Sequence, residues 1–145
     1  MRKHLVYVLL SATMGLSSCL KGPEPDSTPV IQPQGNFAGQ FTKIHRNVLN
    51  NKRDTVKLNI QLKLTGNKYE AINTDERHAA SNGAFEYNRQ FIVWYDNTIT
   101  TAANLNLPPY HLHGQFAYQF DGTNFSFSAS DYADTVKYVY ALKKQ

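Results

Sequence analysis

Cysteine is almost absent from this chain of 145 residues, because Cys19 is the only one. No disulfide can form within the chain, so its stability has to come from side-chain packing. Long apolar runs are missing as well. The longest, residues 5–15 (LVYVLLSATMG), is about half the length that a membrane-spanning helix needs. The sequence therefore excludes a disulfide-stabilised domain, and this run is too short to cross a bilayer as a helix.

Motifs of the common enzyme classes are also missing. The chain has no Gly-x-Ser-x-Gly elbow, no His-Glu-x-x-His pair, no phosphate-binding glycine loop and no second cysteine. Glu70 and Glu86 fall at polar positions of expected strands, where a solvated carboxylate is the ordinary case, and nothing pairs them as acid and base. We therefore predict that the protein is not an enzyme and uses no cofactor.

The first eighteen residues are typical of a secretory signal peptide. A basic start, Met1–His4, precedes the apolar run, and small residues follow it before Cys19. Removal of residues 1–18 takes away Arg2 and Lys3, so thirteen Lys and Arg then stand against eleven acids, a net charge of about +2 instead of +4. This small surplus gives no support to a nucleic-acid partner.

A proline-rich stretch follows the signal region and predicts a tether over residues 19–36. Proline lacks a backbone donor and favours extended chain, so at ~3.1 Å per residue the stretch would hold a folded domain up to roughly 50 Å from its attachment point. The alternative is that part of it packs on the domain as an ordered arm. The four prolines are Pro23, Pro25, Pro29 and Pro33.

From residue 37 onward, apolar and polar residues alternate with period two, which is typical of strands with one buried face. The clearest case is Thr55–Leu64 (TVKLNIQLKL). If Gly66-Asn67 forms a two-residue hairpin turn after it, Leu64 faces Tyr69 and Leu62 faces Ala71. Apolar side chains then meet across the two strands, as the register requires.

A second hairpin is predicted from residues 112–120 and 125–129, which flank Asp121-Gly122. Asp-Gly between alternating apolar residues is a strong signal for a two-residue hairpin turn. The expected cross-strand pairs are Tyr118 with Phe125 and Phe116 with Phe127.

The remaining strands complete an all-β domain over residues 37–145. They are expected at 37–44, 83–96 and 136–142, and because 83–96 exceeds the usual strand length we predict two strands turning near Asn88-Arg89. The resulting seven or eight antiparallel strands, with no helix, predict a single up-and-down barrel, since closure removes both sheet edges. One apolar face per strand favours a water-soluble barrel with an apolar lumen, because a membrane barrel turns its apolar face outward.

The four residues Leu16-Ser17-Ser18-Cys19 resemble the bacterial lipobox. The resemblance implies cleavage before Cys19, a diacylglyceryl group on its thiol and an acylated amino terminus, and several acyl chains anchor a protein stably where one does not. It also implies the outer membrane, because Leu20 stands where an Asp would retain the protein in the inner membrane of many Gram-negative bacteria. Glu24 and Asp26 leave both the periplasmic face and the cell surface open.

The layout after the tether resembles small lipoproteins with a lipocalin-like, calycin-type barrel. The segments that carry the resemblance are GNFAGQF, LHGQFAYQFDGTNFSF and YVYALKK, in this order. The resemblance extends over residues 35–145 and implies a lipocalin-like barrel domain at 37–145.

A set of aromatic side chains is expected to share the inner face of this barrel. Rings with a few hydroxyls suit a small apolar or amphipathic ligand, but an eight-stranded barrel is just wide enough either to hold such a ligand or to be filled by its own side chains. Our first hypothesis is an envelope barrel that binds a small apolar molecule. The second is a packed barrel that binds a protein or glycan through its outer face or through loops such as Asn97–Pro109. The residues expected to line the lumen are Tyr69, Phe116, Tyr118, Phe125, Phe127, Tyr138 and Tyr140.

His111 and His113 are the only candidate metal ligands that the spacing suggests. They would share one strand face, opposite Leu112 and Phe116, and so point outward. A site would need a third ligand, and two histidines on a wet strand face are usually solvated. We therefore predict no metal.

Overall fold

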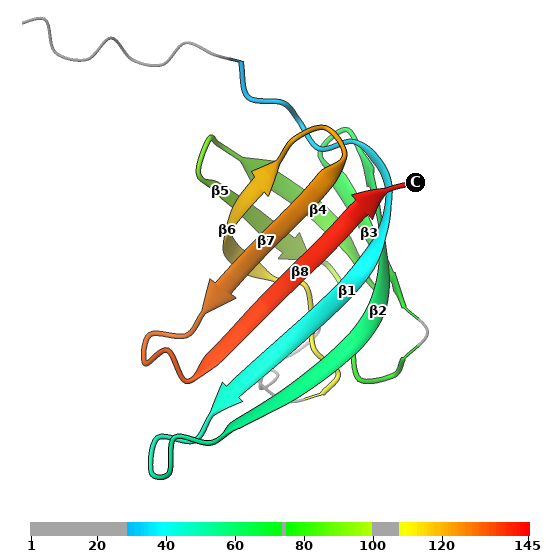
Figure 1. Ribbon diagram of the computed structural model, residues 1–145. Coiled ribbons are helices and arrows are strands. Elements are labelled where there is room, and N and C mark those ends of the chain that lie inside the picture. Colours follow the sequence, from blue (N-terminus) through cyan, green and yellow to red (C-terminus); the bar gives the residue numbers. More distant parts are fainter. Residues whose placement is uncertain (1–28, 74, 100–107) are drawn as a thin grey trace, which may run out of the picture.

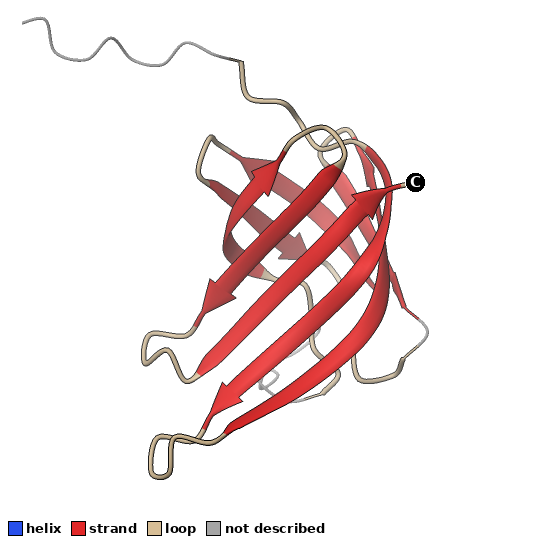
Figure 2. Ribbon diagram, viewed as in Figure 1, coloured by secondary structure: helices blue, strands red, loops and turns tan. Residues whose placement is uncertain are grey.

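The computed structural model describes residues 29–73, 75–99 and 108–145. These residues form eight β-strands, each antiparallel to the next, and β8 also pairs with β1 to close the barrel (Figures 1 and 2). The predicted all-β up-and-down barrel is thereby confirmed. In the described part of the chain, no helix has the length and apolar content needed to span a membrane. The strands are β1 Gly35–Arg46, β2 Arg53–Thr65, β3 Lys68–Asn73, β4 Ser81–Tyr87, β5 Phe91–Asp96, β6 Gly114–Phe120, β7 Asn124–Ser130 and β8 Val136–Lys144.

Two of the predicted turns are confirmed. Gly66-Asn67 joins β2 to β3 with Leu64 opposite Tyr69, and Gly66 has a φ of 59°, which glycine adopts without strain. The stretch at 83–96 divides into β4 and β5 as expected. There the side-chain oxygen Oδ1 of Asn88 accepts bonds from the backbone N–H groups of Gln90 and Phe91, and this fixes the turn.

The predicted register of the second hairpin is wrong by two residues. Phe120 pairs with Phe125 and Tyr118 with Phe127, rather than Tyr118 with Phe125. The reason is the Asp121 carboxylate, which accepts bonds from the N–H groups of Thr123 and Asn124 and so starts the turn instead of occupying its centre. Because the shift is even, every side chain keeps the face that the alternation predicts.

The connections β3–β4 and β5–β6 are bonded to each other across one end of the barrel. The Tyr110 N–H donates to the Arg77 carbonyl at 2.8 Å, and the Ala79 N–H donates to the Tyr110 carbonyl at 2.8 Å. As a result β6 begins at Gly114 rather than at Leu112, because the residues before it cross this end. Residues 74 and 100–107, which include most of the loop predicted at 97–109, lie outside the described residues.

The segment before β1 is attached to the other end of the barrel. Gln34 both donates to the Gly66 carbonyl and accepts from its N–H, Gln32 donates to the same carbonyl, and Pro33 is buried. This part of the predicted tether is therefore an ordered arm. The predictions for residues 1–28, which include the signal peptide and Cys19, fall outside the described residues.

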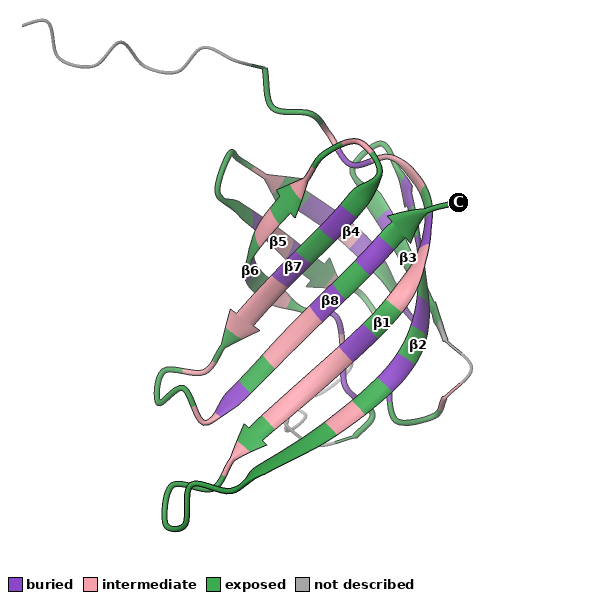
Figure 3. Ribbon diagram, in the orientation of Figure 1, coloured by how far each residue is buried: buried purple, intermediate pink, exposed green. Residues whose placement is uncertain are grey.

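The core is the inside of the barrel. Burial alternates along each strand, so that apolar residues face inward and polar residues such as Lys57 and Gln61 of β2 face outward (Figure 3). Every strand and this whole core belong to residues 29–145, and the barrel closes without any earlier residue. We therefore expect the segment 29–145 to fold on its own.

Candidate functional site

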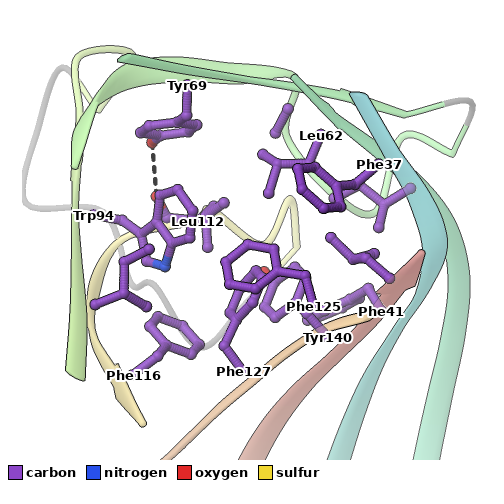
Figure 4. Close-up of a cluster of buried hydrophobic side chains, with 14 of the residues drawn as sticks. Phe37, Phe41, Leu62, Tyr69, Trp94, Leu112, Phe116, Phe125, Phe127 and Tyr140 are labelled. Carbon is purple, nitrogen blue, oxygen red and sulfur yellow. Dashed lines mark hydrogen bonds between the residues drawn. The ribbon is translucent and has the colours of Figure 1, made fainter. Parts of the chain in front are cut away.

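The aromatic side chains predicted to line a lumen lie against one another in the middle of the barrel (Figure 4). Phe127 stacks on Tyr140 with ring centroids 4.4 Å apart, and Phe125 is 4.9 Å from Phe127. These separations are direct ring contacts. Five of the seven predicted residues, Tyr69, Phe116, Phe125, Phe127 and Tyr140, are almost completely buried. The other two, Tyr118 and Tyr138, are partly buried and pack against the edge of the cluster.

Trp94 is the largest side chain in this cluster, and the sequence did not reveal its place. Both faces are apolar around it, so the alternation is ambiguous at that point. It is fully buried, with its ring centroid 5.1 Å from that of Tyr69 and 5.2 Å from that of Phe127. Its position between Tyr69 and Phe127 connects these two rings within the cluster.

Three polar side chains inside the barrel, Tyr69, His78 and Tyr140, are hydrogen-bonded, whereas Trp94 Nε1 and the Ser81 hydroxyl are buried without a hydrogen-bond partner among the described residues. The Tyr69 hydroxyl donates to the Leu112 carbonyl at 2.8 Å, and His78 Nε2 lies 2.9 Å from the Tyr140 hydroxyl. Burial lowers the pKa of His78 and raises the pKa values of both tyrosines. These groups are therefore neutral near pH 7, and the arrangement is that of a structural network.

The two candidate metal ligands are not brought together. His113 is exposed, whereas His111 turns toward the barrel end and places Nδ1 2.8 Å from the buried carboxylate of Asp96. Asp96 also accepts from the backbone N–H and hydroxyl of Thr98. Among the described residues, no three His, Cys, Asp or Glu side chains are grouped so that they could hold a metal ion.

Two neighbouring loops stand out at the end opposite the N-terminal arm (Figure 1). We call them the distal hairpins: the β1–β2 loop, residues 47–52, and the β7–β8 loop, residues 131–135. They lie side by side because β1 pairs with β8, and the Arg46 N–H donates to the Thr135 carbonyl at 2.7 Å. A cleft of about 470 Å³ separates them, lined by Ile44, Arg46, Asn51, Arg53, Asp134, Thr135 and Lys137.

The tips of the distal hairpins carry exposed apolar side chains. Val48 and Leu49 are 67% and 93% exposed on one tip, and Tyr132 is fully exposed on the other. Single exposed apolar residues are normal on a protein surface, but three at the tips of two neighbouring hairpins make these tips a candidate interaction site. The alternation of apolar and polar residues does not predict this feature, although a Val-Leu pair between asparagines in a loop indicates exposed apolar side chains.

Side-chain caps hold the backbone of both tips. The side chains of Asn47 and Asn50 accept from the N–H groups two residues later in the chain. In the second loop, the Asp131 carboxylate accepts from the N–H groups of Thr135 and Val136, and the Thr135 hydroxyl lowers the pKa of this carboxyl. The apolar tips are therefore presented by ordered loops.

Comparisons with protein-family models, with curated proteins and with solved structures found no match to this chain. The described residues offer aromatic rings in contact across the barrel interior, buried hydrogen bonds of Tyr69 and His78, and a surface of apolar tips and charged residues on the distal hairpins.

Proposed function

We propose that this protein is a non-enzymatic, lipid-anchored protein of the bacterial envelope that holds a partner through its distal hairpins. The barrel serves as a rigid support for these loops. The observation that carries the proposal is the contact between rings across the barrel interior, where Trp94, Phe125 and Phe127 occupy the space that a ligand would need. This packing favours the second of the two sequence hypotheses over a ligand-carrying lumen.

The lipobox and the N-terminal arm support the anchoring part of the proposal. Acylation of Cys19 would attach the chain to the outer membrane, as the resemblance to bacterial lipoproteins implies. The arm reaches the barrel at the Gly66 turn, which lies at the other end from the distal hairpins. The hairpin end is therefore the part of the barrel farthest from the point where the tether enters.

The anchor and the binding end are tested separately in cells. Labelling with an alkyne fatty acid should mark the full chain, and Cys19→Ser should abolish the label. A photo-crosslinking residue at position 49 should capture a specific partner, whereas one at position 95, on the side wall of β5, should not. Equal capture at both positions, or none at position 49, would contradict the proposal.

A separate experiment tests whether the barrel lumen holds a ligand. Native mass spectrometry of residues 29–145, purified without denaturation, should show the bare polypeptide mass, and a hydrophobic dye should find no saturable site. A co-purifying apolar molecule that the dye displaces would instead restore the ligand-binding hypothesis.

A further inference from the structure

The distal hairpins combine aliphatic tips, an interfacial aromatic residue and a cationic cleft at one end of the barrel. Val48 and Leu49 project from one tip, Tyr132 from the next, and the cleft between them offers Arg46 and Lys137. We propose that this end binds the surface of an anionic phospholipid bilayer. The inference rests on the proposed function, since it names the partner that the hairpins hold.

The aliphatic tips favour a bilayer over the other partners. Val48 and Leu49 gain free energy only by entering an apolar environment, which a glycan does not provide. The outward residues of β2 beside the tips, such as Lys57, are polar and exposed, so the outer face of this strand adds no apolar surface next to the tips. Protruding apolar tips on a polar wall fit a flat, soft surface. Tyr132 fits the same surface, because tyrosine is enriched where lipid meets water.

The charges of the cleft suit phosphate headgroups. Arg46, Arg53 and Lys137 line it against one acid, Asp134. Within the described residues, none of these three cations forms an ion pair. Each Lys or Arg near an anionic membrane surface adds attraction that salt screens, so binding should weaken as ionic strength rises.

The tether is long enough to let the hairpin end reach the membrane that would hold the anchor. Strand β2 has 13 residues, and with a rise of ~3.3 Å and a tilt of about 40° this gives a barrel height of roughly 33 Å. The stretch from Cys19 to Ile31 extends to roughly 40 Å at ~3.1 Å per residue. A barrel turned over on this tether would therefore bring the hairpins to the membrane that holds the anchor.

Vesicle binding by the unlipidated segment 29–145 tests the inference. It should co-sediment with vesicles of phosphatidylglycerol and phosphatidylethanolamine, and less so with pure phosphatidylcholine. Replacing both Val48 and Leu49 by serine should weaken binding by about tenfold or more. The matched control is Ile31→Ser, because Ile31 is 58% exposed beside the Gly66 turn at the opposite end of the barrel, and this variant should leave binding unchanged.

Two further measurements distinguish insertion of the hairpin tips into the bilayer from electrostatic attraction to its surface. Tyr132→Trp should show a blue shift of its emission with anionic vesicles, whereas Tyr95→Trp on the side wall should not, and the buried Trp94 gives a constant background in both. Arg53→Gln with Lys137→Gln should weaken binding and flatten its salt dependence.

Different results would contradict the bilayer proposal and the proposed function. No binding to anionic vesicles, or equal binding to phosphatidylcholine, overturns the inference. If position 49 then captures a glycan or a protein in cells, the hairpins are a binding end with a different partner, and the proposed function stands. If position 49 captures nothing, both are wrong.

Discussion

His78 Nε2 lies 2.9 Å from the phenolic oxygen of Tyr140, and both side chains are almost completely buried. The other ring nitrogen, Nδ1, lies 2.9 Å from the Ala79 carbonyl, which can only accept a hydrogen bond. Nδ1 therefore carries the proton, Nε2 accepts the bond from the Tyr140 hydroxyl, and the imidazole is neutral. Charging this ring would place a cation inside the barrel and would turn Nε2 into a donor toward the phenolic oxygen.

The first prediction is that His78 makes the fold sensitive to acid. Its pKa is lowered in the folded protein, chiefly by burial, so the unfolded chain binds the proton first. Stability is therefore unaffected by this site at high pH and falls as the pH drops below about 6.5, the ordinary histidine pKa. Urea unfolding between pH 5 and pH 8 measures the effect.

Comparison of His78→Gln with the natural protein separates the pH dependence of stability due to His78 from that due to the carboxylates. At pH 8 the variant should be less stable than the natural protein by about 1–3 kcal/mol, because it leaves the Tyr140 hydroxyl without its partner. The difference should shrink toward pH 5, where only the natural protein suffers from the ring's protonation. His45→Gln, an exposed control, should run parallel to the natural protein. A constant gap for His78→Gln would contradict the neutral-ring assignment.

The second prediction concerns the filled interior. Phe127→Ala should lower the free energy of unfolding by about 3–5 kcal/mol, because a fully buried ring is lost and a cavity remains. Phe91→Ala, at a position that is 36% exposed, should cost about 1 kcal/mol. Chemical denaturation of residues 29–145 gives both values.

The same variant tests whether the lumen is closed to ligands. An apolar cavity of this kind binds small aromatic molecules, so benzene should raise the melting temperature of Phe127→Ala but leave the natural protein unchanged. A benzene-induced shift in the natural protein would show that a cavity exists beside the rings.

The sequence predicted the structure correctly where a local signal decides it, such as alternation along a strand or a glycine in a turn. Alternation placed Leu62, Leu64 and Tyr69 on the inner face, and Gly66 set the first hairpin. The same logic identified the barrel, because eight strands with one apolar face have few other ways to bury it. It failed at Asp121, where a side chain bonded to the backbone moved the turn without changing the alternation.

The candidate site was harder to predict because it depends on contacts between distant residues. Nothing local indicates that the 47–52 loop lies beside the 131–135 loop, since that follows from the pairing of β1 with β8. His111 likewise left its expected outward position because Asp96, fifteen residues earlier, offers a buried carboxylate. Whether aromatic rings fill a barrel or line a cavity depends on the closed geometry, which periodicity does not contain.

The third prediction concerns the closure of the barrel at Gly39. A Cβ atom at this position would lie 2.1 Å from the Ala141 carbonyl oxygen and 2.8 Å from the Leu142 Cα on β8. Because both are backbone atoms, the two strands would have to separate. Gly39→Ala should therefore cost about 3 kcal/mol or more, measured by thermal unfolding. Ala38→Gly on the same strand should cost about 1 kcal/mol or less. Equal losses would mean that the β1–β8 contact tolerates a side chain.

The fourth prediction connects loop order with binding at the distal hairpins. Asp131→Ala removes the acceptor for the N–H groups of Thr135 and Val136, so these two amides should exchange hydrogen faster while the amides of the core strands stay protected.

Lowering the pH should weaken the order of this loop as Asp131→Ala does. The Asp131 pKa is lowered by the Thr135 hydroxyl, so its stabilising effect is present above about pH 4 and is lost as the pH falls through the lowered value. If the order of this loop presents Tyr132 to a membrane, the variant should also bind anionic vesicles more weakly, because ordering the loop on binding then costs free energy. Faster exchange without weaker binding would show that the tip orders itself on the bilayer, and unchanged exchange would show that the carboxylate is not what holds the loop.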